Sequence, residues 1–160
     1  MNEIVITTKV AVFNSADDLP EAERALPEAA MSALQKAYAP YSGFKVGAAI
    51  LLENGAVETG SNQENAAYPM CLCAERVALA AASARFPEVS PIAIAVRVKS
   101  SGKPVVRPAA PCGACRQALS ETEDRYKRPI AVLMQGEEGE IFRVENSKAL
   151  LPLSFDGTYL

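Results

Sequence analysis

The chain has 160 residues, and 49% of them are hydrophobic, which is enough for one domain with its own core. Its 16 basic and 19 acidic residues give a net charge of −3, whereas nucleic-acid binders usually gather an excess of Lys and Arg on one face. No run is long and apolar enough to span a bilayer, and the first residues lack the pattern of a secretion signal, so we expect a cytoplasmic protein.

The first half of the chain predicts one strand, one helix and one hairpin. β-branched residues dominate positions 4–13 and predict a strand within an N-terminal extension of residues 1–20. A helix is predicted over 27–39, because proline is tolerated in a first helical turn and Pro40 ends the pattern. Residues 45–52 and 57–60 predict a hairpin around an Asn-Gly turn.

The second half alternates between helices and strands. We predict a helix from Cys73 to about residue 84, a buried strand over 92–99 and a helix that begins at Cys112. Strands are predicted over 130–134 and 140–144, followed by a C-terminal arm, 147–160. This order indicates an α/β fold for a single domain, 1–160: a three-layer α/β/α sandwich with a mixed central sheet of about five strands.

The chain has four cysteines and no histidine. A tight transition-metal site in it must therefore use thiolates and carboxylates as ligands. Cys73, Cys112 and Cys115 can occupy three corners of a tetrahedral zinc site and leave the fourth for water, as catalytic zinc sites do. Glu75, two residues after the first of these thiols, is the type of base that moves the protons of such a water.

The predicted helices bring these thiols to suitable places. Cys112 and Cys115 are three residues apart at a helix start and therefore face the same side. Cys73 begins a different helix, and the positive ends of two helices would favour thiolates over thiols. We expect Arg76 to lie behind the metal ligands and to donate hydrogen bonds to their sulfurs.

Two other interpretations use the same cysteines. A Cys-x-x-Cys pair alone is also typical of a redox-active dithiol, although that function leaves Cys73 and Glu75 unexplained. Cys71 is a fourth thiol near the first ligand. If it reached the metal, it would close the site with four cysteines and produce a non-catalytic zinc module. Otherwise it is a small buried hydrophobic residue or an oxidation-prone neighbour of the site.

Several segments together resemble the zinc-dependent cytidine deaminases, specifically the small homotetrameric type with three cysteine ligands. The resemblance covers about residues 27–155. It is carried by Tyr41-Ser42-Gly43-Phe44-Lys45-Val46-Gly47-Ala48-Ala49, Asn62-Gln63-Glu64-Asn65-Ala66-Ala67-Tyr68-Pro69, Cys73-Ala74-Glu75-Arg76, Pro111-Cys112-Gly113-Ala114-Cys115-Arg116-Gln117 and Leu150-Leu151-Pro152-Leu153-Ser154-Phe155.

This resemblance implies a zinc-dependent hydrolase of pyrimidine salvage that converts cytidine and 2′-deoxycytidine to uridine and 2′-deoxyuridine with release of ammonia. It implies one Zn²⁺ per chain on the three thiols named above, with Glu75 as the proton shuttle. A deaminase of another aminopyrimidine nucleoside or antibiotic is the alternative reaction.

The resemblance also implies substrate contacts and an assembly. The residues implied to contact the nucleoside are Phe44, Asn62, Glu64, Ala74, Tyr68 and Phe155. Asn62 and Glu64 would hold the ribose hydroxyls, and Phe155 would stack on the pyrimidine in the site of a neighbouring subunit. We therefore expect a homotetramer with shared active sites, a small-molecule partner, and neither a nucleic acid nor a membrane partner.

Overall fold

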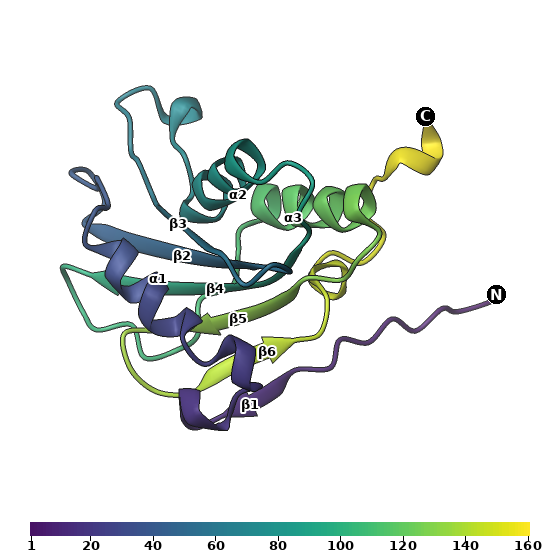
Figure 1. The fold of residues 1–160 in the computed structure, drawn as a ribbon, viewed down its shortest axis with the longest axis horizontal. Helices are drawn as coiled ribbons and strands as arrows, with labels where there is room; N and C mark the ends of the chain where they lie inside the picture. The colour runs from purple at the N-terminus through teal and green to yellow at the C-terminus, as the bar shows by residue number, and fades with distance from the viewer.

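The computed structural model describes residues 1–160 and contains one six-stranded mixed sheet with helices on both faces. The strand order is β1-β6-β5-β4-β2-β3. Helix α1 lies on one face of the sheet, and helices α2 and α3 lie on the other (Figure 1). The elements are β1 (Ala11–Phe13), α1 (Leu26–Leu34), β2 (Phe44–Leu52), β3 (Val57–Ser61), α2 (Ala74–Arg85), β4 (Pro91–Ser100), α3 (Gly113–Tyr126), β5 (Ala131–Gln135) and β6 (Ile141–Val144).

This architecture confirms the predicted three-layer α/β sandwich, with six strands in place of about five. The central pairing is antiparallel between β2 and β4, with Ile50 opposite Ile94. β4 and β5 are parallel, with Ile94 opposite Val132, so the chain must cross over between them, and α3 lies within that crossover. The sixth strand is β1, which pairs antiparallel with β6 at the edge of the sheet.

Alternate residues of the central strands supply two separate apolar cores, one on each face of the sheet. Ile50 and Ile94 pack with α2 and α3, whereas Ala49 and Ala95 pack beneath α1. These residues are almost completely buried. The sheet therefore has no solvent-facing side over its centre, which explains the near-continuous apolar sequence of β4.

Two glycines set how closely the helices approach the sheet. A Cβ atom at Gly47 would lie 2.0 Å from the carbonyl oxygen of Ala30 in α1. A Cβ atom at Gly60 would lie 2.5 Å from the carbonyl oxygen of Ala74 and 2.5 Å from the amide nitrogen of Ala78 in α2. Any larger residue at Gly60 would push the first turn of α2 outward, and that turn follows Cys73 directly.

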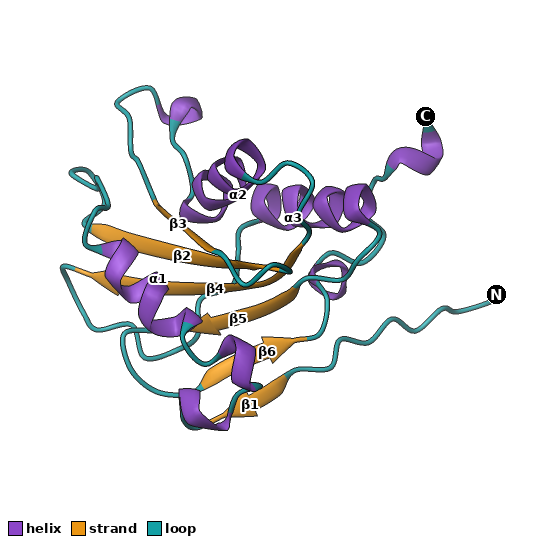
Figure 2. Cartoon of the chain, viewed as in Figure 1, coloured by secondary structure: helices purple, strands orange, loops and turns teal.

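Two predicted elements were too long. The strand predicted over 4–13 is formed only at Ala11–Phe13, because the preceding residues are exposed and have no strand beside them (Figure 2). The helix predicted to reach residue 39 ends at Leu34. The backbone of Tyr38 instead pairs with the segment after β3, since its N–H donates to Asn62 and its carbonyl oxygen accepts from Glu64.

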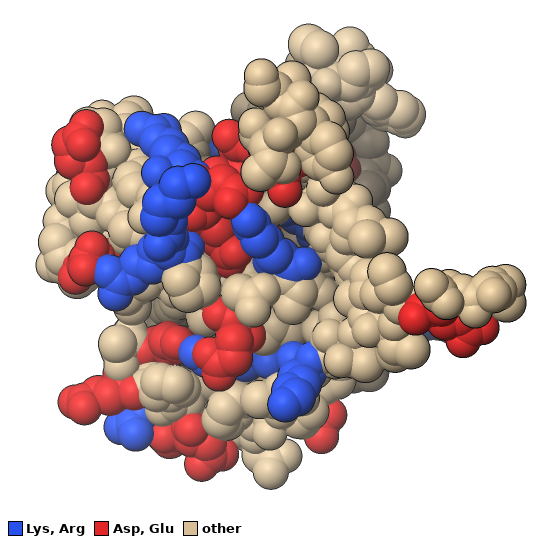
Figure 3. Space-filling view, turned by 90° about the vertical axis from the view of Figure 1, so that its right-hand side faces the viewer, with Lys and Arg blue, Asp and Glu red and all other residues tan.

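Both chain ends project from the same side of the molecule, at the right of Figure 1. On that face acidic and basic side chains are interspersed, without a continuous field of one sign (Figure 3). This distribution agrees with the small net charge of the chain. None of the helices is long and apolar enough to cross a membrane.

Candidate active site

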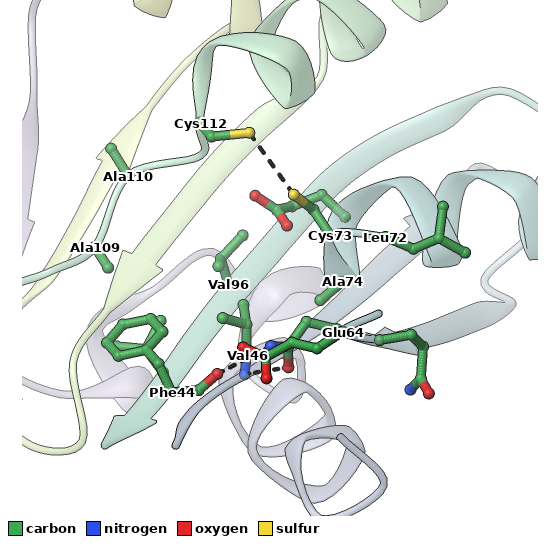
Figure 4. A pocket seen from close by; sticks show the side chains of 14 residues that line it. Phe44, Val46, Glu64, Leu72, Cys73, Ala74, Val96, Ala109, Ala110 and Cys112 are labelled. Atoms are coloured by element: carbon green, nitrogen blue, oxygen red, sulfur yellow. Dashed lines mark hydrogen bonds between the residues drawn. The ribbon is translucent and has the colours of Figure 1, made fainter. Parts of the chain in front are cut away.

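Three thiols meet where the N-termini of α2 and α3 converge. Cys73 is the residue before the first turn of α2, Cys112 holds the same position in α3, and Cys115 follows in the first turn of α3. The Sγ atoms of Cys73 and Cys112 lie 3.7 Å apart (Figure 4), and those of Cys112 and Cys115 lie 3.4 Å apart. All three sulfurs lie within 4.8 Å of one another.

This cluster fits one zinc ion per chain. Zinc–sulfur bonds of about 2.3 Å in tetrahedral geometry place two sulfur ligands about 3.8 Å apart, close to the separation of Cys73 and Cys112. The helix N-termini leave backbone N–H groups free near the sulfurs, where they would stabilise negative charge. The buried Nε of Arg76 has no hydrogen-bond partner, so a positively charged donor is also available beside the cluster.

The electrostatics of the cluster favour a thiolate at Cys73. Hydrogen bonds from Cys115 and then from Cys112 lower the pKa of the Cys73 thiol to about 5, and the charge of Arg76 contributes in the same direction. The pKa of Cys115 is raised, chiefly by its hydrogen bond to Cys73 and then by burial. Among the three thiols, Cys73 is therefore the one whose surroundings most favour the thiolate form.

Glu75 is a buried carboxyl group in the first turn of α2, and 4% of its surface is exposed. Burial raises its pKa above the usual range, and the charge of Cys73 adds to this effect. Glu75, Cys73 and Cys112 line the same pocket. A group able to exchange a proton therefore lies next to the thiol cluster, as the sequence predicted.

The pocket has a volume of about 250 Å³ and is mostly apolar. Phe44 and Val46 come from β2, Val96 and Val98 from β4, and Ala109 and Ala110 from the segment that precedes α3. Figure 4 shows the sulfurs of Cys73 and Cys112 at the end away from Phe44 and Glu64. The charged residues of the lining are carboxylates, and neither Lys nor Arg contributes to it.

Asn62 lines the pocket and is bonded to the backbone of β2. Its Oδ1 accepts from the N–H of Val46 at 2.8 Å, and its Nδ2 donates to the carbonyl oxygen of Phe44 at 2.9 Å. One N–H of the amide group is left for a ligand. The ribose contact that the resemblance implies for Asn62 and Glu64 did not indicate that these side chains also organise the protein.

Glu64 is bonded to the turn that precedes Phe44. Its carboxylate accepts the N–H groups of Tyr41, at 2.8 Å, and Ser42, at 3.3 Å, and also the hydroxyl of Ser42. The Ser42 hydroxyl, followed by these N–H groups, lowers the pKa of the carboxyl group below its usual range. Glu64 is therefore a carboxylate at neutral pH, and it borders the pocket.

Two residues expected at the substrate do not line the pocket of their own chain. Tyr68 is 71% exposed, and its ring meets Tyr41 edge-on, with 6.4 Å between the ring centroids. Phe155 is 58% exposed and is stacked on Tyr159 in the C-terminal segment, with centroids 5.4 Å apart. Ala74, by contrast, belongs to the pocket lining.

Cys71 and Arg76 contact each other beside the thiol cluster. The Sγ of Cys71 accepts from the N–H of Asn65 at 3.3 Å, and Cys71 is not one of the three clustered thiols. Nη2 of Arg76 donates to the carbonyl oxygen of Cys71 at 3.1 Å. The structure therefore places Arg76 next to the cluster, with its one clear hydrogen bond to backbone and not to sulfur.

Sequence reasoning missed most of the apolar lining. Val96 and Val98 were predicted only as part of a buried strand, and nothing in that pattern separates a core residue from a pocket residue. Ala109 and Ala110 carry no chemical signal, but their place just before Pro111 and Cys112 would have been a reason to consider them.

Comparison with known proteins identifies relatives of this arrangement. The sequence model for the "Cytidine and deoxycytidylate deaminase zinc-binding region" matches residues 20–132. A cytidine deaminase from Halalkalibacterium halodurans is 40% identical over 126 residues, which span 79% of this chain and 88% of that protein.

Solved structures agree with the sequence comparison. The crystal structure of cytidine deaminase from Burkholderia pseudomallei has a TM-score of 0.71 and 44% identity, over 82% of this chain and 97% of that one. The enzyme from Mycobacterium tuberculosis gives a TM-score of 0.63 and 32% identity, over 81% of this chain and 94% of that one.

Proposed function

This chain belongs to the cytidine and deoxycytidylate deaminase zinc-binding family and is a zinc-dependent hydrolase, and from that premise we propose that it deaminates cytidine and 2′-deoxycytidine in pyrimidine salvage. The products are uridine or 2′-deoxyuridine and ammonia. The observation that carries this proposal is the buried Glu75 beside three convergent thiols at one end of a nucleoside-sized pocket.

Cys73, Cys112 and Cys115 would hold the zinc ion, which would supply a water polarised enough to act as a nucleophile near neutral pH. Glu75 takes a proton from the attacking water. It delivers this proton to N3 of the pyrimidine as the water oxygen bonds to C4. It then moves the remaining proton of that oxygen to the amino group on C4, so that the C4–N bond breaks, the oxygen becomes the C4 carbonyl and ammonia leaves. One carboxyl group serves both steps because it alternates between base and acid.

Side chains of the pocket walls bind the nucleoside. Phe44 packs against the nucleoside, and the free N–H of Asn62 together with the carboxylate of Glu64 holds the ribose hydroxyls. Because these polar groups would be left unpaired by a base without its sugar, the site selects nucleosides over free cytosine. Two carboxylates and the lack of any cation in the lining disfavour a substrate that carries a phosphate.

Two exposed aromatic residues suit an assembly of four chains. Phe155 lies on a projecting C-terminal segment, and Tyr68 is exposed near the pocket on a 3₁₀ turn, Tyr68–Met70. In a homotetramer, Phe155 reaches the pyrimidine bound by a neighbouring subunit, and Tyr68 lies at a subunit contact. Light scattering of the purified protein tests this arrangement, which predicts the mass of four chains.

A substrate panel tests the proposed reaction. The zinc-loaded protein is given cytidine, 2′-deoxycytidine, cytosine and cytidine monophosphate, and ammonia release is measured for each. We expect turnover of both nucleosides, none of cytosine and little of the monophosphate. Zinc-loaded protein that deaminates neither cytidine nor 2′-deoxycytidine would overturn the proposal. Growth of a uracil-requiring bacterium on cytidine, dependent on this protein, tests the role in salvage.

A further inference from the structure

One wall of the pocket lies on a segment without regular secondary structure. Residues 101–111 join β4 to α3 as a loop (Figure 2), and Ala109 and Ala110 of this loop line the pocket. Residues 106–110 make no hydrogen bond within the protein. The hydrogen bonds that hold the loop on either side of these residues therefore help to set their position.

On the side toward α3, the loop is held by that helix. Nε of Arg116 donates to the carbonyl oxygen of Pro111 at 2.7 Å. Cys112 follows directly and begins the helix. This anchor fixes the end of the loop that carries a zinc ligand.

On the other side, the loop is held by the turn between β5 and β6. One carboxylate oxygen of Glu137 accepts the N–H of Ser100 at 3.0 Å and that of Val105 at 3.2 Å. The backbone N–H of Glu137 donates to the carbonyl oxygen of Val105 at 2.7 Å. Val105 is thus held through both its N–H and its carbonyl group.

Arg97 fixes the turn itself. Its Nε donates to the carbonyl oxygen of Gly136 at 3.0 Å, and its Nη2 donates to that of Glu137 at 2.8 Å. Arg97 is buried, which lowers its pKa, and it forms no ion pair, so its hydrogen-bonding capacity serves the backbone of the turn. It points to the α1 face of the sheet and does not line the pocket.

The loop and the turn are also in direct contact. A Cβ atom at Gly136 would lie 2.2 Å from the carbonyl oxygen of Val105 and 3.2 Å from that of Arg107. Only glycine lets the two backbones approach this closely. Arg97, Gly136 and Glu137 together are called the clasp below.

We propose that the clasp positions the Ala109–Ala110 wall and thereby sets the affinity of the pocket for its nucleoside. Arg97 and Glu137 are positioning residues, since neither lines the pocket nor lies in the thiol cluster. This inference rests on the proposed function above. The loop then has two anchors with different roles. Arg116 holds the end that carries the metal ligand, whereas the clasp holds the end that leads to the Ala109–Ala110 wall.

The test compares Glu137→Ala with Glu137→Gln, and Glu138→Ala is the matched control because Glu138 is exposed and has no hydrogen-bond partner in the protein. For each zinc-loaded variant, kcat and KM for cytidine, zinc content and the affinity for uridine are measured. Glu137→Ala should raise KM and weaken uridine binding about tenfold, with kcat within about threefold and one zinc per chain, because a displaced wall weakens binding without removing a reacting group. Glu137→Gln keeps an acceptor oxygen and should restore most of the affinity.

Three results would overturn the inference. The first is a KM for Glu137→Ala equal to that of Glu138→Ala. The second is loss of zinc from Glu137→Ala, which would place the effect at the metal ligands. The third, which applies if Glu137→Ala does not fold, is a normal KM in Gly136→Ala, whose new Cβ pushes directly on Val105. Failure of the proposed function is recognised separately, because the unmodified protein would then neither deaminate cytidine nor bind uridine.

Discussion

The carboxylate of Glu64 accepts the backbone N–H of Tyr41 at 2.8 Å, although the two residues are 23 positions apart. The same carboxylate bonds to Ser42, whose hydroxyl accepts from the N–H of Phe44 at 3.0 Å. A charged wall of the pocket is therefore linked, through one serine, to the residue proposed to pack against the nucleoside. Glu64 organises the protein as well as the proposed ribose site.

Replacing Glu64 should weaken substrate binding more than it slows the reaction. Glu64→Ala removes the acceptor for three donors, and hydrogen bonds to a charged acceptor are stronger than those between neutral groups. We expect KM for cytidine to rise at least tenfold, and steady-state kinetics measure it. Ser42→Ala keeps the two backbone bonds to the carboxylate and should raise KM less. An unchanged KM in Glu64→Ala would contradict both roles given to this residue.

Cys71 should be dispensable for metal binding. Its sulfur contacts the backbone of Asn65 and lies outside the thiol cluster, so Cys71→Ser should retain one zinc per chain and the turnover of the parent. Cys112→Ser, by contrast, should lose zinc or bind it far more weakly, since one of three thiolates is gone. Metal analysis after dialysis measures both. Loss of zinc from Cys71→Ser would instead indicate a site with four cysteine ligands.

The clasp should also contribute a pH-dependent part of stability. The N–H of Ser100, followed by that of Val105, lowers the pKa of Glu137 below its usual range. The pKa of Glu137 in the folded protein is therefore below its value of about 4.3 in the unfolded chain. The stability that Glu137 contributes is fully present above about pH 4.3 and is lost as the pH falls through the pKa of the folded state. Glu137→Gln should therefore be less stable than the parent at pH 7, and the difference should shrink below about pH 4. Urea unfolding at pH 7, 5 and 3.5 measures it, and a difference that grew toward acid would contradict the assignment.

A buried ion pair joins the segment just before α1 to strand β6. Arg143 of β6 donates to Glu23 through Nε at 2.8 Å and Nη2 at 2.9 Å, and both side chains are about nine-tenths buried. Glu23→Ala leaves the guanidinium without its main partner and should lower the free energy of unfolding by about 3 kcal/mol. Glu145→Ala removes the exposed second partner and should cost less than about 1 kcal/mol. Equal losses in the two variants, measured by urea unfolding, would contradict this difference.

The sequence predicted well wherever a local pattern agreed with the tertiary structure. Cys73 and Cys112 were predicted as helix starts, and each precedes the first helical residue. The hairpin and the buried strand were found within one or two residues, because the side chains of β2 and β4 face cores on both sides of the sheet and an Asn-Gly turn marks the hairpin. The three thiols could be associated from spacing and chemistry without knowledge of the fold.

The features that the sequence did not predict depend on pairing between segments far apart in the chain. Residues 4–10 have high β propensity, but a strand needs a partner, and only Ala11–Phe13 find one at β6. Tyr38 has helical spacing from Leu34, yet its backbone pairs with the segment that carries Asn62 and Glu64. The clasp could not be predicted either, because Arg97 and Glu137 look like ordinary charged residues until β4 and β5 are placed side by side.

The most direct test of the proposed mechanism is ammonia release from cytidine by Glu75→Gln, with the zinc content of the same sample. The amide keeps the size of the side chain and cannot carry protons between water and substrate. We predict one zinc per chain and a kcat about 10² to 10⁴ times lower than that of the parent, the range expected when a general acid–base group is lost. A Glu75→Gln protein that binds zinc and deaminates cytidine at the parent rate would contradict the role of Glu75 and the mechanism built on it.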